Sequence, residues 1–201
     1  MLSATLVTDG SSDSVLTRAL EWLLGQHTDQ EFEIRWADLR LLRHRPSNLS
    51  ERLQAAIEIY PCRLLFVHRD AEAQNPNLRY QEIAAANLTQ LPHVCVVPVR
   101  MQEAWLLHDE RALREAAGRP SGSDLLSLPP ISRFERIVDP KDLLHAALRT
   151  ASGASGRRAR TFKPARAAHR LAELITDWSP LRKLGAFERL ETDVIQALSQ
   201  L

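Results

Sequence analysis

The sequence predicts an α/β fold in which a mainly parallel sheet of four or more strands is flanked by helices, with a helical C-terminal extension. The central indication is an unbroken apolar run at 64–67, Leu-Leu-Phe-Val, which is typical of a strand buried on both faces. Short strand patterns alternate with helical patterns around this run, as in sheets built from strand–helix–strand units. After Val99 the strand patterns stop, and the remaining chain shows helical spacing broken by loops.

The first strand is predicted over 4–8 and ends at the turn-forming pair Asp9-Gly10. Apolar residues then recur at helical spacing as far as Leu24, and Asp13 falls in the first turn of this helix, where a carboxylate is favourable. Over 31–36 charged and apolar residues alternate strictly, which indicates a strand with one buried face. The chain is therefore expected to begin as strand, helix and strand.

The next segments continue this alternation. Leu, Ile and Ala at helical spacing predict a helix over 48–60, which leads into the apolar strand at 64–67. A further helix is expected over 77–88, and the run His-Val-Cys-Val-Val-Pro-Val at 93–99 predicts a fourth strand.

The C-terminal half is predicted to be helical. Residues 101–118 read as a helix that ends at Gly118, and a Pro- and Ser-rich loop follows over 119–132. Helices are also expected over 140–150, 164–176 and about 185–198, with a flexible, Gly-rich and basic linker over 152–163. We therefore expect an α/β core over 1–118, and a loop with a helical extension packed on that core over 119–201.

Composition excludes several classes of protein. No apolar segment approaches the roughly 20 residues that span a bilayer, and the N-terminus lacks the pattern of a signal peptide, so a cytoplasmic protein with no membrane contact is expected. Cys62 and Cys95 have neither the CxxC spacing nor the His cluster of a zinc site, which predicts free thiols in a reducing compartment. Trp105 lies in a uniformly apolar pattern and is expected in the core rather than as a base-stacking platform.

One local basic patch stands out in a chain whose formal net charge is only +1. It consists of Arg157, Arg158, Arg160 and Lys163, which are candidates for binding nucleic-acid phosphates. A solvated linker explains the same residues equally well, and the sequence leaves both interpretations open.

Acidic residues follow the first, third and fourth predicted strands. They are Asp9 and Asp13 after the first strand, Asp70 and Glu72 after the third, and Glu103 and Asp109 after the fourth. The carboxyl ends of parallel strands meet at one edge of the sheet, where ligands bind. Carboxylates gathered there without matching cations repel one another, and a divalent ion such as Mg²⁺ or Mn²⁺ relieves the repulsion. Such an ion can activate water and neutralise phosphate charge, the two needs of phosphodiester hydrolysis.

Each of these residues also has a simpler explanation. Asp and Glu are favoured at strand ends and helix starts as turn formers, caps and partners of the helix dipole. Asp13 and Asp109 could be no more than that. His68, next to Asp70 in the chain, could be a structural histidine, a general base near neutral pH or a neighbour of a metal.

Several motifs resemble a known family. They are LVTDGSSDSVL, LLFVHRDAEA and VPVRMQEAWLLHD, followed by DPKDLL, FKPARAAHRLAELI and FERL nearer the C-terminus. In these segments the chain resembles the Toprim-like proteins grouped as domain of unknown function four-two-seven-six, which are related to the Toprim domain of OLD-type nucleases found in phage-defence loci. The resemblance implies a Toprim-like Rossmannoid fold and a metal-dependent nuclease that acts on DNA or RNA. The chain has no Walker motif, so the ATPase partner implied by the resemblance would be another chain.

The resemblance also implies roles for individual residues. Asp9 stands where Toprim domains have a glutamate for acid/base chemistry or metal binding, and Asp70 matches the second aspartate of an Asp-x-Asp motif. His68 replaces the first aspartate with a nitrogen ligand that Mg²⁺ binds poorly and Mn²⁺ accepts more readily. Glu72 could restore the missing carboxylate, since residues 70 and 72 share a face in an extended stretch. The implied catalytic residues are Asp9, Asp70 and Glu103, and the implied ligands of Mg or Mn are these three with His68 and Glu72.

Two functions remain open at this point. The first is a metal-dependent nuclease, active in phage defence with an ATPase partner. The second is a catalytically degenerate Toprim-like interaction module that binds a partner protein or nucleic acid, because Asp9 is one methylene shorter than glutamate and His68 is not a carboxylate. A homo-oligomer is compatible with either function.

Overall fold

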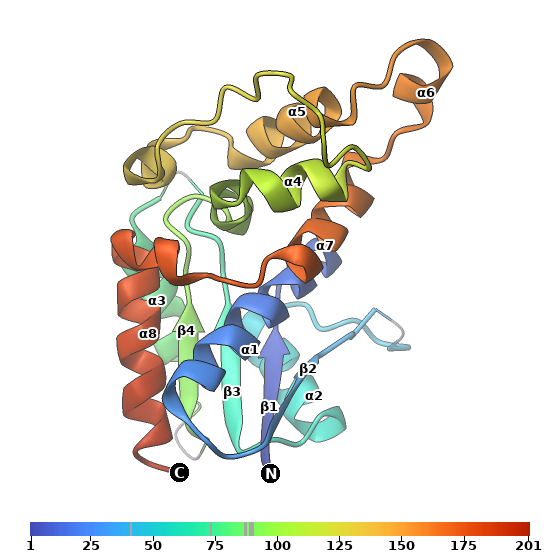
Figure 1. The fold of residues 1–201 in the computed structure, drawn as a ribbon. Coiled ribbons are helices and arrows are strands. Elements are labelled where there is room, and N and C mark those ends of the chain that lie inside the picture. Colours follow the sequence, from blue (N-terminus) through green and yellow to red (C-terminus); the bar gives the residue numbers. More distant parts are fainter. Residues whose placement is uncertain (41, 73, 87, 89–90) are drawn as a thin grey trace.

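A four-stranded, fully parallel sheet forms the centre of the molecule (Figure 1). The computed structural model describes residues 1–40, 42–72, 74–86, 88 and 91–201, and it confirms the predicted α/β class. The strands, in chain order, are β1 (Leu2–Val7), β2 (Phe32–Trp36), β3 (Leu64–His68) and β4 (His93–Val96). Their order across the sheet is β2-β1-β3-β4, so β1, β3 and β4 lie side by side as the acidic residues after them require.

The strand order changes direction between β1 and β3. The chain runs from β1 to β2 on one side and then returns to β3 on the other, with Leu6 paired to Trp36 and to Phe66. Loops that leave two adjacent strands in opposite directions open a crevice at the carboxyl edge, which is where open α/β sheets bind ligands. The loops after β1 and β3 therefore hold the expected position of a functional site.

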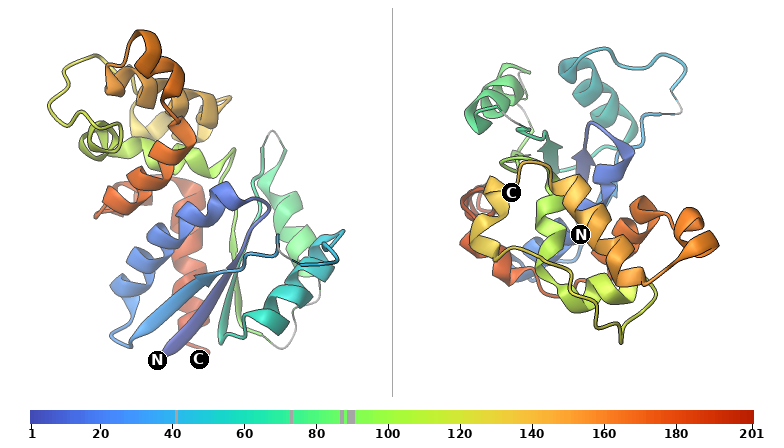
Figure 2. Two further views of the ribbon diagram at one scale, coloured as in Figure 1. Left: turned by 90° about the vertical axis from the view of Figure 1, so that its right-hand side faces the viewer. Right: turned by 90° about the horizontal axis from the view of Figure 1, so that it is seen from above.

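Helices cover both faces of the sheet, which makes three layers (Figure 2). The helices α1 (Leu16–His27) and α8 (Gly185–Leu198) cover one face, and α2 (Leu49–Ile59) and α3 (Pro76–Ala85) cover the other. Successive strand residues alternate between the two layers: Phe66 packs in the cluster with α1, and Leu65 and Val67 pack in the cluster with α2. Burial on both faces explains why β3 is apolar throughout.

The C-terminal region lies across the carboxyl edge of the sheet (Figure 1). Its elements near that edge are η2 (Gln102–His108), α4 (Glu110–Ala116), α5 (Pro140–Ser152) and α7 (Pro164–Leu174). One hydrophobic cluster joins both sides of position 118, and Trp105 meets Phe187 edge to face with ring centroids 5.3 Å apart. Trp105 is 2% exposed, so its predicted place in the core is confirmed.

Several elements differ from those predicted. The helix expected over 101–118 is two helices, because Asp109 ends η2 and its side chain accepts a hydrogen bond from the N–H of Ala112 as the cap of α4. The basic linker contains a helix, α6 (Gly156–Thr161). Short 3-10 helices, which carry no amphipathic period, were not predicted; they are η1 (Ser11–Val15), η3 (Ile131–Arg136) and η4 (Ser179–Lys183). The helix expected over 77–88 ends at Ala85, and position 87 lies outside the described residues.

Two expectations from composition can also be compared with the structure. Cys62 and Cys95 are free thiols, each partly buried, as predicted. Within the ranges described above, no helix has the length and apolar character needed to cross a bilayer.

Two glycines, one after the C-terminal end of α5 and one inside α1, are expected to respond to alanine with opposite signs. Gly153 follows α5 with φ of 57°, and a Cβ there would meet the guanidinium of Arg119, so Gly153→Ala should lower the free energy of unfolding by about 1–2 kcal/mol. Gly25 lies inside α1, where a Cβ would make only an ordinary contact with Phe32, so Gly25→Ala should raise it by about 0.5–1 kcal/mol. Urea unfolding of both variants measures the difference, and equal changes would contradict this account of α5.

Candidate active site

Four ionisable side chains meet at the carboxyl edge of the sheet, and we call them the acidic pocket: Asp13, His68, Asp70 and Glu103. Asp13 comes from η1 after β1, His68 ends β3, Asp70 follows it, and Glu103 lies in η2 after β4. The imidazole Nε2 of His68 lies 3.5 Å from Asp70 Oδ1 and 3.9 Å from Asp13 Oδ2. The loops after three adjacent strands therefore converge on one histidine.

The turn after β1 places Asp13 in this pocket. The N–H of Gly10 donates to Asp13 Oδ2 at 2.9 Å, and the hydroxyl of Ser12 donates to Asp13 Oδ1 at 2.8 Å. These bonds fold the carboxylate back over the turn, and the residue is only 6% exposed. Asp13 thus caps its own turn, as the simpler explanation predicts, and its carboxylate also lines the acidic pocket.

His68 is the centre of the pocket and is 1% exposed. Its Nδ1–H donates to the carbonyl of Val96 at 2.9 Å, which fixes the proton of the neutral ring on Nδ1. Burial lowers the pKa of His68, although the charge of Asp13 opposes that shift. The Nε2 lone pair therefore faces the carboxylates with no hydrogen-bond partner among the described residues.

Asp70 carries the largest shift of any carboxyl in the pocket. Burial, followed by the charges of Asp13 and Glu103, raises the pKa of Asp70 to about 8. The backbone N–H of Gln102 donates to Asp70 Oδ1 at 3.0 Å and partly opposes this rise. In the absence of a cation, Asp70 is consequently mostly protonated at neutral pH and ionises as the pH rises past 8.

Glu103 is buried on the opposite wall and is 5% exposed. Burial raises its pKa, and the nearest cation, Lys141 Nζ of α5, is 3.8 Å from Oε1. Its other oxygen, Oε2, is buried without a hydrogen-bond partner in the described part of the chain. An unpaired buried carboxylate oxygen is costly, and it is the kind of atom that a ligand satisfies.

Asp9, the expected acid/base residue, turns away from the acidic pocket. Its Oδ2 lies 3.0 Å from Arg69 Nε, and its Oδ1 pairs with the guanidinium of Arg52. Asp9 is close enough for its charge to raise the pKa of Asp70, but this effect is smaller than those of Asp13 and Glu103. Arg52 and Arg69 therefore already neutralise Asp9, the carboxylate to which the resemblance assigns acid/base chemistry or metal binding.

Glu72 does not share the face of Asp70. Its φ of 54° takes it out of the extended conformation on which that expectation rested, and its side chain is exposed. The other predicted binding residues, Arg157, Arg158, Arg160 and Lys163, are exposed on α6 and at the start of α7.

The donor set of the acidic pocket fits a divalent cation by its chemistry. Three carboxyl groups and a neutral imidazole, whose Nδ1–H is held by the carbonyl of Val96, form a mixed oxygen and nitrogen set that suits Mn²⁺ better than Mg²⁺. These side chains are too far apart to coordinate an ion as they stand, since no group of three or more His, Cys, Asp or Glu in the described residues is arranged to hold one. Binding would therefore require the carboxylates to move toward Nε2 of His68.

The sequence pattern places Asp13 among the acidic residues at this edge but assigns it no metal-binding or catalytic role, and it does not point to Lys141. The segment Asp-Pro-Lys at 139–141 belongs to one of the motifs that carry the resemblance, and no spacing links it to η2. Lys141 reaches Glu103 because α5 packs on η2, a contact between elements distant in the sequence.

Comparisons with known proteins add no assignment. The chain has no match among protein-family models, curated proteins or solved structures.

Proposed function

We propose that this protein is a divalent-cation-dependent phosphodiesterase that cleaves DNA or RNA at the acidic pocket. The observation that carries the proposal is the pocket itself. The carboxyl groups of Asp13 and Asp70 lie within 4 Å of the unprotonated Nε2 of a neutral histidine, Glu103 is buried nearby, and among the described residues only Lys141 forms an ion pair with Glu103. Such an arrangement is unfavourable without a ligand, and a cation is the ligand that its charge and donor atoms suit.

The residues divide into binding and positioning groups. Asp70, Glu103 and His68 Nε2 would hold the cation, with Asp13 supplying further negative charge beside it. A bound divalent cation would activate water and neutralise the charge of a phosphate. Lys141, at the rim on α5, is exposed enough to contact a phosphate oxygen while it stays near Glu103. The Val96 carbonyl and the Gln102 N–H would keep His68 and Asp70 in place.

A second function is favoured by a different observation. Asp9 is bound by Arg52 and Arg69, and the spacing of the pocket is not closed around an ion. A catalytically degenerate module that binds a partner protein or nucleic acid would need neither an unpaired Asp9 nor side chains spaced to hold an ion. The ATPase partner and the role in phage defence that the resemblance implies stay predictions under both functions.

Metal titration separates the two functions. We expect isothermal calorimetry to detect binding of Mn²⁺ more strongly than of Mg²⁺, and labelled DNA or RNA to be cut in the presence of Mn²⁺. Glu103→Gln, which removes the charge and keeps the shape, should weaken Mn²⁺ binding at least about tenfold, as the loss of a charged ligand of this kind does.

The matched control is Glu58→Gln on the exposed face of α2, which should leave the titration unchanged. If neither metal binds and no substrate is cut, the nuclease proposal fails and the interaction module takes its place.

A further inference from the structure

An open, basic groove runs along α7 at the top of the molecule. It has a volume of about 590 Å³ and is lined by the tip of α6, by α7 and by Ala116 of α4. Its ionisable lining residues are Lys163, Arg166, His169, Arg170 and Glu173. Lys163, Arg166 and Arg170 are exposed, and across the described ranges none of them has a carboxylate within ion-pair distance. Glu173 is the one acidic residue of the lining.

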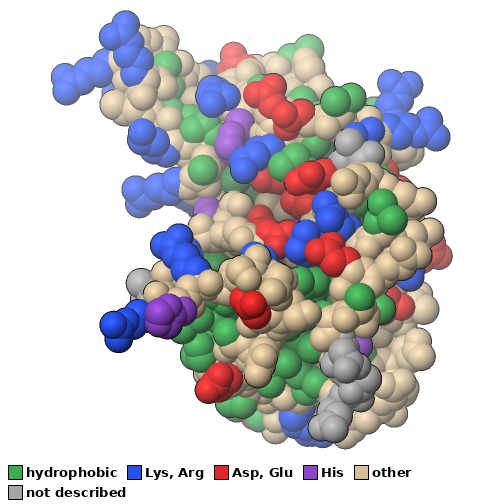
Figure 3. All heavy atoms as spheres, turned by 180° about the vertical axis from the view of Figure 1, so that it is seen from behind, with side chains coloured by type: hydrophobic (Ala, Val, Ile, Leu, Met, Phe, Trp, Pro, Cys, Tyr) green, Lys and Arg blue, Asp and Glu red, His purple; other side chains and the backbone are tan. Residues whose placement is uncertain are grey.

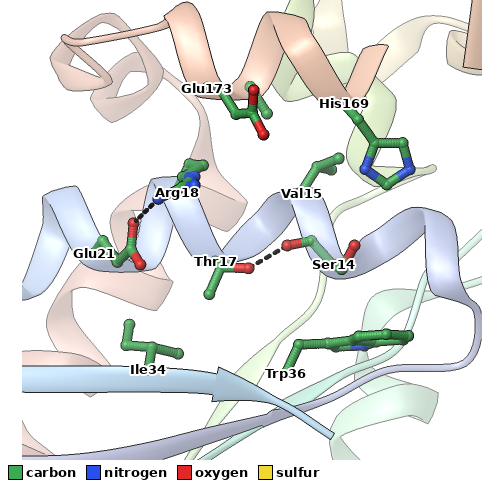
Figure 4. Close-up of a pocket in the computed structure, with 10 residues that line it drawn as sticks. Ser14, Val15, Thr17, Arg18, Glu21, Ile34, Trp36, His169 and Glu173 are labelled. Carbon is green, nitrogen blue, oxygen red and sulfur yellow. Dashed lines mark hydrogen bonds and ion pairs between the residues drawn. The ribbon is translucent and has the colours of Figure 1, made fainter. Parts of the chain in front are cut away.

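The groove shares one lining residue, His169, with a small cavity beside Glu103. This residue also lines a small cavity of about 60 Å³ together with Glu103, Lys141 and His145. It lines a third cavity, of about 340 Å³, between α7 and α1. Figure 4 shows the His169 ring extending from α7 toward η1, beside Val15 and above Ser14. One side chain therefore borders the basic groove, the mouth of the pocket and the cleft beside α1.

We propose that this groove binds a single-stranded segment of nucleic acid, and that His169 and Lys141 lead one phosphate of that segment to Glu103. The proposal rests on the proposed function for the cleavage step, but binding in the groove needs no metal. The unpaired cations of α7 would contact the backbone phosphates.

The charge distribution supports a path rather than an isolated patch. Figure 3 shows Lys and Arg side chains gathered on the projecting corner where α6 lies, with Asp and Glu side chains toward the middle of the same face. Arg157, Arg158 and Arg160 of α6 add to the cations of α7 at that corner. The basic residues of α6 thus extend the row of cations that lines the groove along α7.

The shape of the site favours a single strand over a duplex. Glu103, Asp13 and His68 are each at most 6% exposed, and the cavity at their mouth is close to the volume of two water molecules in the liquid. The phosphates of a rigid duplex lie on a broad convex surface and cannot enter such a recess, whereas a flexible single strand can bend into it. Phe162, partly buried at the edge of the groove, offers the aromatic face on which single-stranded bases stack.

Fluorescence anisotropy in EDTA tests binding without cleavage. The probes are a labelled single strand of roughly 12 nucleotides and the blunt duplex of the same sequence. We expect the single strand to bind more tightly, and the double variant Arg166→Ala/Arg170→Ala to lose at least about tenfold in affinity at about 50 mM salt. Its slope of log affinity against log salt should fall by about 1.4, since each phosphate contact to a single strand contributes about 0.7.

The matched control is Arg133→Ala/Arg136→Ala on η3, whose arginines are also exposed but lie on the opposite side of the helical region (Figure 1). It should keep the affinity and the slope of the wild type. Phe162→Leu, which preserves packing volume, should weaken the single strand at least about fivefold and leave circular dichroism unchanged. An equal or tighter duplex, no binding of the single strand, or an equal loss in both double variants would overturn the proposal, and none of these results alters the metal titration that tests the acidic pocket.

Discussion

Asp70→Asn is expected to make the metal-free protein more stable at pH 8 while it removes nuclease activity. The folded protein raises the pKa of Asp70 to about 8 from 3.8, so between these values the folded state binds a proton that the unfolded state does not. Stability from this group is therefore present at low pH and is lost as the pH rises toward 8. From pH 5 to pH 8 the wild type should lose on the order of 3 kcal/mol, and Asp70→Asn should lose much less because asparagine does not titrate.

Urea unfolding in EDTA at pH 5 and pH 8 measures this difference. The stability difference between the two proteins should be smaller at pH 5, where Asp70 is protonated in the folded state, and the variant should be the more stable at pH 8. Mn²⁺ should stabilise only the wild type at pH 8, and cleavage should fall on the order of a thousandfold in the variant, because a cation contributes several kcal/mol to the transition state. Asp38→Asn is the control: Asp38 is partly exposed and its ion pair with Arg40 lowers its pKa to about 2, so its replacement should not stabilise the protein at pH 8. A wild type whose stability does not fall between the two pH values would contradict the burial of Asp70.

The sequence was sufficient to predict the parallel sheet and the edge at which the acidic residues meet. The apolar run of β3 and the alternation of β2 express burial directly, because each residue of a strand must face one layer or the other. Element ends were predicted less well. The 101–118 pattern is apolar throughout, and periodicity alone could not locate the break at Asp109, whose cap begins a new helix.

The spacing of residues in the sequence could not predict which carboxylates enter the acidic pocket. Asp9 and Asp13 both follow β1, and the sequence cannot tell which one turns inward. The turn at Gly10 and the 3-10 geometry of η1 decide this, by folding Asp13 back over its own backbone while Asp9 faces Arg52 and Arg69. Those arginines come from α2 and from the end of β3, so the pairing depends on tertiary contacts. Glu72 shows the same limit, since a single left-handed residue cancels the alternation that placed it beside Asp70.

His68→Asp is expected to destabilise the metal-free protein and to strengthen its binding of Mg²⁺. The new carboxylate would stand among three others at a position that is 1% exposed, and it would lose the hydrogen bond to Val96. An added buried charge costs several kcal/mol without a partner. In EDTA at pH 8 we expect the melting temperature to fall by about 6–12 °C, which corresponds to roughly 3 kcal/mol for a chain of this length. Mg²⁺ should reverse most of this loss, because an oxygen ligand suits Mg²⁺ better than an imidazole nitrogen does, and a ligand at 100 times its Kd contributes about 2.7 kcal/mol.

His68→Asn isolates the effect of charge in this experiment. Asparagine has the size of aspartate and also gives up the imidazole bond to Val96, but it adds no charge, so its melting temperature should respond little to Mg²⁺. The ratio of Mg²⁺ to Mn²⁺ affinity, measured by calorimetry, should rise in His68→Asp relative to the wild type and should not rise in His68→Asn. If Mg²⁺ stabilises the two variants equally, the four side chains of the acidic pocket do not act together on a cation. His68 would then be a structural histidine that holds β3 to β4 through Val96, and the carboxylates around it would be caps of the turns from which they come.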